Sequence, residues 1–223
     1  MKTISLVERQ KKNKYRFNIY LDGEFAFGAD EDTVVNFRLL KGKQIEEADL
    51  ERILLETEVG KIMERMYGLF GRRQRTEREV RDYLRNLSFK RKLKDQEEIS
   101  DFIIEQVIER LKTKQLLNDA MFAAEWTRAR QISKKKGQVA IRQELMQKGI
   151  SKEIIDEVMS QNITEGGEQK LAVEALEKKM RLFKGLEGME LKQKVLQFLI
   201  RKGFSYDVAK DTVEDFMKKN ASF

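Results

Sequence analysis

The chain contains a short motif twice, and this internal repeat constrains the fold more than any other feature. Gly149-Ile150-Ser151 recurs as Gly203-Phe204-Ser205, at an offset of 203 minus 149, or 54 residues. In each copy the glycine follows a run with helical periodicity, which predicts a left-handed turn that ends one helix. The serine two residues later predicts the N-cap of the next helix. The repeated unit is therefore predicted to be a helix, a glycine turn and a second helix.

The repeat extends to three copies. Apolar pairs four residues apart recur upstream of the motif at spacings of 61 and 54 residues: Val80 and Leu84, Ile141 and Leu145, and Val195 and Leu199. A further helix is predicted before each pair, over residues 59–70, 119–133 and 167–184. A unit of three short helices buries its apolar faces poorly without neighbours, so the copies are expected to stack into an elongated tandem array.

The first 29 residues follow a different pattern, in which apolar and polar side chains alternate as they do in strands. Asp22-Gly23 interrupts the alternation and predicts a β-hairpin. With a two-residue turn the aromatic side chains divide between the two faces of the hairpin; with a three-residue bulged turn they share one face. We favour the three-residue turn, which gives the pairs Ile19 with Phe25 and Phe17 with Phe27. This segment is expected to be separable from the helices.

Between the hairpin and the motif, the periodicity predicts a short helix over residues 31–40 and a long one from Leu50 to Phe70 that Gly60 could bend. Thr76 and Glu79 have the spacing of a capping box and predict a helix over residues 77–87. The acidic run from Asp95 to Glu98 is expected to open the next helix, with its apolar face at Ile99, Phe102, Ile103, Val107 and Leu111.

The absence of certain residue types excludes several chemistries. The chain has no histidine and no cysteine, so it cannot build a Ser-His-Asp triad, a thiolate nucleophile or a zinc site on sulfur or imidazole. Glu97, Glu98 and Asp101 could gather a hard metal for nuclease chemistry, but carboxylates at a helix N-terminus are usually helix-stabilising. We therefore expect no enzyme activity, no catalytic residue, no metal and no cofactor. Neither a signal sequence nor a membrane span is predicted, and the expected location is cytoplasmic.

Basic residues are concentrated in two segments. Residues 72–94 hold ten basic and three acidic residues, a net +7, which equals the net charge of the whole chain. Residues 128–148 hold seven basic residues and one acidic residue, a net +6. A solvated helix face is the bland interpretation of any one of these residues, but the asymmetry favours polyanion binding by the clusters. Arg78, Arg81 and Arg85 share one helix face and could follow a phosphate backbone. The candidate binding residues are Arg72, Arg73, Arg75, Arg78, Arg81, Arg85, Arg128, Arg130, Lys134, Lys135, Lys136 and Arg142.

Two other residue types invite a functional interpretation and a structural one. Trp126 is the single tryptophan and could stack on bases, but its spacing from Phe122 and Ala129 favours a helix face that packs in the core. Met63 and Met66 are likewise expected to fill the core.

Several strings in this order resemble the bacterial RecX family. Residues 73–84 (RQRTEREVRDYL) resemble its first-repeat signature, residues 117–119 with Phe122-Ala123 resemble the opening of its second repeat, and Lys148-Gly149 and Lys202-Gly203 are similar to its two Lys-Gly turns. Residues 20–27 resemble the N-terminal extension of longer members from Gram-positive bacteria. The chain departs from the family pattern at Asn118, commonly acidic, and at Gly166-Gly167.

The resemblance implies a mainly α fold of tandem three-helix repeats in an elongated curved array, preceded by a small β-hairpin. The expected divisions are residues 1–48, 49–116, 117–163 and 164–223. The implied function is regulation, by restraint, of the RecA recombinase through binding in the groove of its filament on single- or double-stranded DNA. The alternative is a DNA- or RNA-binding helical regulator that needs no recombinase. We expect a monomer, since the repeats can cover one another.

Overall fold

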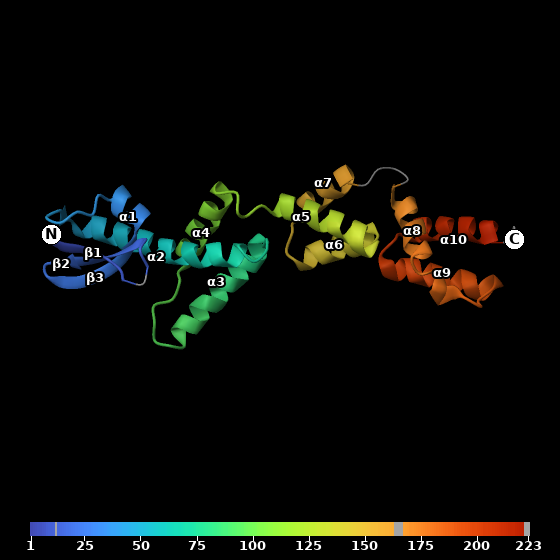
Figure 1. The fold of residues 1–223 in the computed structure, drawn as a ribbon, viewed down its shortest axis with the longest axis horizontal. Coiled ribbons are helices and arrows are strands. Elements are labelled where there is room, and N and C mark those ends of the chain that lie inside the picture. The colour runs from blue at the N-terminus through green and yellow to red at the C-terminus, as the bar shows by residue number, and fades with distance from the viewer. Residues whose placement is uncertain (12, 163–166, 221–223) are drawn as a thin grey trace. The chain divides into compact units, whose positions relative to one another are not determined.

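The computed structural model describes residues 1–11, 13–162 and 167–220 of the 223-residue chain. Figure 1 shows a small sheet at the N-terminus followed by helices, as the change of sequence period predicted. The strands are β1 (Lys2–Arg9), β2 (Arg16–Leu21), β3 (Glu24–Asp30) and β4 (Gln44–Ile45), in the antiparallel order β3-β2-β1-β4. The predicted hairpin is therefore the β2–β3 part of a four-stranded sheet.

The favoured register of this hairpin was wrong. Ile19 pairs with Phe27, Tyr20 with Phe25 and Leu21 with Glu24, around a two-residue Asp22-Gly23 turn. Both turn residues have positive φ, 51° for Asp22 and 92° for Gly23, as the turn that matches strand twist requires. A β-bulge shifts the register of the two strands between Ile19 and Tyr20. Phe27 is buried, whereas Phe25 is exposed.

Helix α1 (Glu31–Asn36) is shorter than expected, and α2 (Glu47–Phe70) begins earlier than expected and is not divided at Gly60. The position of Asp30 explains why residue 60 is a glycine. Its side chain caps α1 by accepting a hydrogen bond from Thr33 N at 2.7 Å, and its Oδ2 lies 2.1 Å from where a Cβ on Gly60 would be. Gly60 therefore lets α2 approach the end of β3 closely. The first half of α2 joins the core of the sheet through Ile53, beside Ile4, Ile19, Phe27 and Leu39.

Helix α3 (Glu77–Lys92) begins at the predicted cap, where Thr76 Oγ1 accepts a hydrogen bond from Glu79 N at 3.2 Å. Helix α4 (Asp101–Thr113) does not begin at the acidic run. Its N-cap is Ser100, because Ile99 is buried and its N–H donates to Ser88 Oγ at 2.9 Å in α3. The start of α4 is therefore fixed by a contact with another helix, and its buried face is Ile104, Val107, Ile108 and Leu111.

The remaining helices form two further groups of three. The second repeat consists of α5 (Asp119–Ala129), α6 (Gln138–Gln147) and α7 (Lys152–Asn162), and the third of α8 (Gly167–Glu177), α9 (Gly188–Lys202) and α10 (Tyr206–Asn220). A π-helical turn, Arg130–Lys134, extends α5, and a 3-10 turn, Met180–Phe183, follows α8. The Asn118 side chain caps α5 by accepting a hydrogen bond from Met121 N at 2.9 Å. Asparagine therefore still provides an N-cap at this position, where the family commonly has an acidic residue. Gly166 lies outside the described residues.

The predicted repeat is confirmed. The six apolar residues that defined it are all fully buried: Val80, Leu84, Ile141, Leu145, Val195 and Leu199. Gly149 and Gly203 are left-handed, with φ of 82° and 87°, and Ser151 and Ser205 accept hydrogen bonds from Ile154 N and Val208 N. The fold is mainly α and is built of tandem three-helix repeats. Its elongated, curved arrangement and the four expected divisions stay predictions, and the boundary at 163/164 lies outside the described residues.

The chain divides into two compact units. The first contains Met1–Gln74 and Arg81–Leu117, and the second contains Arg75–Val80 and Asn118–Phe223, so that the first turn of α3 belongs with the later repeats. Within the second unit, each Lys-Gly turn contacts the N-terminus of a preceding helix. Thr76 Oγ1 donates to Lys148 O at 2.8 Å, and Gly137 N donates to Lys202 O at 3.0 Å. The two turns therefore join successive repeats.

Candidate polyanion-binding site

Several members of the first basic cluster, residues 72–94, form ion pairs. Arg81 holds both carboxylate oxygens of Glu105 in α4, and this contact lowers the pKa of Glu105. Arg91 pairs with Glu58 at 2.6 Å, and Lys92 pairs with Glu98 at 2.8 Å. Arg72, Arg73, Arg78 and Arg85 are exposed. The face that Arg78, Arg81 and Arg85 were predicted to share therefore has a neutralised residue in its middle.

Arg75 and Arg78 also have structural contacts. The aliphatic stem of Arg78 packs over Gly149, where its Cδ lies 2.3 Å from the point that a Cβ on the glycine would occupy. Arg75 is partly buried, and among the described residues its Nε has no hydrogen-bond partner. Substitutions of these two arginines would therefore change packing as well as charge.

The second basic cluster, residues 128–148, is organised around Glu144. This carboxylate accepts hydrogen bonds from Trp126 Nε1 at 2.7 Å and Arg130 Nε at 2.6 Å, and it also pairs with Lys136. Burial raises the pKa of Glu144, but the bonds from Lys136, Arg130 and Trp126 outweigh it and leave the pKa below its ordinary value. The arrangement is a satisfied network of opposite charges, and it uses the charge of two predicted binding residues.

Trp126 lies at the edge of this network. It stacks on Phe122 with ring centroids 5.7 Å apart, and it packs against the core of the second repeat, as the core interpretation predicted. The Arg130 guanidinium and the Lys148 ammonium lie over its ring, 3.9 Å and 4.5 Å from the ring centroid. Met63 and Met66 are buried, as expected.

The other members of the second cluster differ in their accessibility. Lys135 pairs with Glu174, Arg142 pairs with Asp156, and Lys148 pairs with Glu79 at 3.0 Å. Arg128 and Lys134 are exposed, and within the described parts of the chain neither forms an ion pair. The exposed positive charge of the second cluster therefore belongs mainly to these two residues.

The structure adds three lysines that the sequence did not indicate as binding residues. Burial lowers the pKa of Lys202, and the charges of Lys179, Lys136, Lys178 and Lys134 lower it further. Lys178 and Lys179 follow α8, and Lys202 ends α9, so they come from parts of the chain far from residues 128–148. No local motif identifies them, because their proximity depends on how the second and third repeats pack.

The carboxylates considered for nuclease chemistry have structural roles. Glu98 is paired with Lys92, and Asp101 occupies the first turn of α4. Within the described residues, no three acidic side chains gather in a way that could hold a metal ion. None of the helices in the described part of the chain has the length and apolar character needed to cross a membrane.

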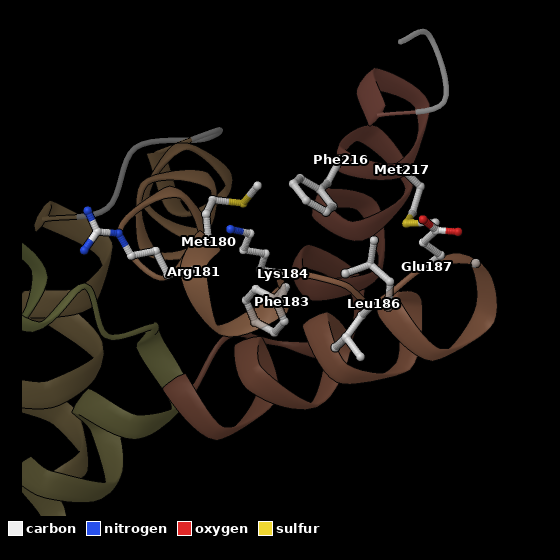
Figure 2. Close-up of a pocket in the computed structure, with 10 residues that line it drawn as sticks. Met180, Arg181, Phe183, Lys184, Leu186, Glu187, Phe216 and Met217 are labelled. Carbon is white, nitrogen blue, oxygen red and sulfur yellow. The ribbon is translucent and has the colours of Figure 1, made fainter.

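The third repeat has a pocket of about 720 Å³ between the 3-10 turn, the start of α9 and the end of α10. Figure 2 shows Phe183, Leu186, Phe216 and Met217 around it. These four residues make the lining mainly apolar, and the charged residues Arg181, Lys184 and Glu187 also belong to it.

Comparisons with known proteins agree with the architecture. The RecX N-terminal domain profile matches residues 2–46, and the profiles of the second and third RecX three-helix domains match residues 118–159 and 167–213. The regulatory protein RecX of Bacillus subtilis is 35% identical over 220 residues, which cover 99% of this chain and 79% of the relative. That of Listeria innocua is 32% identical over 207 residues, covering 93% and 73%.

Two solved structures are similar as well. A crystal structure of regulatory protein RecX has a TM-score of 0.73 and 32% identity, covering 96% of this chain and 100% of that one. RecX from Lactobacillus salivarius has a TM-score of 0.61 and 26% identity, covering 72% and 96%. A profile of the 3-hydroxyacyl-CoA dehydrogenase NAD-binding domain also matches residues 32–129, but these residues form helices and the two-residue strand β4, and they lack the parallel sheet on which a dinucleotide binds.

Three-helix repeats that follow a small N-terminal sheet define a class of helical-repeat proteins. The named relatives are regulatory proteins. The chain belongs to the RecX family.

Proposed function

We propose that this chain binds the RecA filament on DNA and restrains recombinase activity, acting in recombination, DNA repair and the SOS response. Membership of the RecX family carries the proposal, since the similarity to RecX proteins extends over nearly the whole chain. The exposed basic residues support it, because both DNA phosphates and acidic protein surfaces attract them. A cytoplasmic, monomeric protein is part of this proposal.

A titration with and without RecA tests the proposal. Fluorescein-labelled single-stranded DNA is titrated with the chain, bare or coated with RecA in the presence of ATP, and binding is followed by anisotropy. Tighter binding to the coated DNA, together with slower strand exchange, is expected. Equal affinity for both, falling steeply with salt, would instead identify an independent DNA-binding regulator.

The contribution of the arginines is tested best at the exposed ones. Arg72→Ala with Arg85→Ala should weaken binding to RecA-coated DNA and leave stability almost unchanged, because exposed charges contribute little to folding. If both contact phosphates of the single strand, the slope of log affinity against log salt falls by about 1.4 units. Arg65→Ala with Lys14→Ala removes the same charge from exposed positions outside the clusters and serves as the control.

Unchanged binding of the Arg72 and Arg85 variant would remove the first basic cluster from the interface. Substituting Arg75, Arg78 and Arg81 together gives a weaker test, because Arg78 packs over Gly149 and Arg81 is paired with Glu105.

A further inference from the structure

Lysines from three separate segments meet where the second and third repeats join. The Lys202-Gly203 turn is held on the start of α6 by hydrogen bonds from Gly137 N to Lys202 O, at 3.0 Å, and from Val139 N to Gly203 O, at 2.9 Å. The Lys202 ammonium reaches the preceding turn and donates to Lys134 O at 2.8 Å. The end of α8 lies at the same junction, because Glu174, one turn before Lys178 and Lys179, pairs with Lys135 beside Lys134.

Most of this positive charge is not balanced by carboxylates. Lys136 is paired with Glu144, and its neighbour Lys135 is paired with Glu174. In the described residues, by contrast, Lys134, Lys178, Lys179 and Lys202 form no ion pair, and the first three are exposed. We name these four residues the junction lysines.

Helix ends explain part of this arrangement. Lys178 and Lys179 follow the C-terminus of α8, and Lys202 is the last residue of α9, where the helix dipole favours a cation. The interaction with the helix dipole stabilises each lysine separately and does not remove the repulsion between the lysines. Burial lowers the pKa of Lys202, and the charges of the neighbouring lysines lower it further, in the direction that repulsion predicts. A bound anion would relieve this repulsion.

We propose that the junction lysines bind the phosphodiester backbone of single-stranded DNA. Lysine ammonium groups act on phosphate as point charges and carry no base specificity, which suits a backbone contact. The inference deepens the proposed function: it assigns DNA phosphate to a surface that includes three lysines outside both sequence clusters. It does not require RecA, so the two proposals can fail separately.

The test removes the exposed junction lysines. Lys134→Gln, Lys178→Gln and Lys179→Gln are combined, and binding of a labelled thirty-nucleotide oligothymidylate is measured by anisotropy from 0.05 to 0.5 M salt. Because three side chains no longer neutralise phosphates, the slope of log affinity against log salt should fall by about 2 units. If the affinities of the two proteins converge at 1 M salt, this equals a loss of about a hundredfold at 0.1 M.

The control variant carries Lys192→Gln, Lys194→Gln and Lys210→Gln, which remove the same charge from exposed positions on α9 and α10. Its slope should stay near that of the unmodified chain. A variant with Lys178→Arg and Lys179→Arg keeps the charge and should also keep the slope. Should the triple variant fail to fold, the Lys178→Gln and Lys179→Gln pair is measured instead, with an expected fall of about 1.4 units.

Two results would overturn the inference. A folded triple variant with an unchanged slope and a lowered melting temperature would show that the lysines only stabilise helix ends. Normal binding to bare DNA with weaker binding to RecA-coated DNA would show that they contact an acidic protein surface. If the unmodified chain binds bare and RecA-coated DNA equally while the triple variant still shows the lowered slope on bare DNA, the proposed function fails and this inference stands.

Discussion

At the scale of the residue, Gly149 and Gly203 satisfy two requirements at once. Each has a left-handed backbone, which a Cβ strains, and each is touched by another segment. A Cβ on Gly149 would lie 2.3 Å from Cδ of the flexible Arg78 side chain. A Cβ on Gly203 would lie 2.2 Å from Ala140 Cβ and 2.5 Å from its backbone nitrogen, which cannot move aside. The sequence predicted the first requirement, and the second depends on the packing of the repeats.

This difference predicts an order of stabilities. Gly185→Ala is the reference, since Gly185 has a φ of 82° and its Cβ would meet nothing within 4 Å, so it should cost about 1 kcal/mol from backbone strain alone. Gly203→Ala should cost about 2 to 4 kcal/mol, because overpacking adds to the strain. Gly149→Ala should fall between them. Urea unfolding of the three variants measures the order, and equal costs would contradict the packing argument.

At the scale of the element, helix ends were predictable where their caps are local. Thr76, Ser151 and Ser205 all cap helices at positions that the sequence indicates. The start of α4 was not predictable, because the acidic run from Asp95 is a good local signal that a distant contact overrides. The burial of Ile99 and its bond to Ser88 move the cap to Ser100.

Thr76 has a second role, as it caps α3 and also donates to Lys148 O in the next repeat. Thr76→Val should therefore destabilise the chain by about 2 to 3 kcal/mol, from the lost cap and the unpaired carbonyl together. Ser151→Ala removes a cap and should cost about 1 kcal/mol. Thr76→Ser keeps the hydroxyl and should stay close to the unmodified chain. Chemical denaturation compares them, and a Thr76→Val cost no greater than that of Ser151→Ala would exclude the second role.

At the scale of the whole molecule, the sheet is more closely tied to the helices than its sequence suggested. The change of period near Asp30 predicted a separable N-terminal segment. In the first unit, however, Ile53 of α2 completes the core of the sheet, and the buried Arg16 of β2 pairs with Glu64 of α2 at 3.2 Å. Gly60 packs against Asp30 as well.

Deletion of residues 1–29 should therefore disrupt the first unit, because Ile53 and Leu39 would lose their apolar partners. The second unit has its own cores, built from residues such as Leu145 and Leu199, and should stay folded. Hydrogen exchange of the truncated chain measures both: protection should fall in α2 and α4 and persist in α6 and α9. Full protection of α2 would restore the interpretation of a separable hairpin.

The sequence by itself determined the repeat, its buried apolar positions, the glycine turns and most of the caps, because these features depend on neighbours within one or two helical turns. Only the tertiary structure decided which charges are free. In the sequence, every basic residue of the two clusters contributes the same charge as Arg128. In the structure, five of them form ion pairs with carboxylates from other segments: Arg81, Arg130, Lys135, Lys136 and Arg142. Lys178, Lys179 and Lys202 join Lys134 for the same reason. Net charge is additive along the chain, whereas its neutralisation requires side chains that the fold alone brings together.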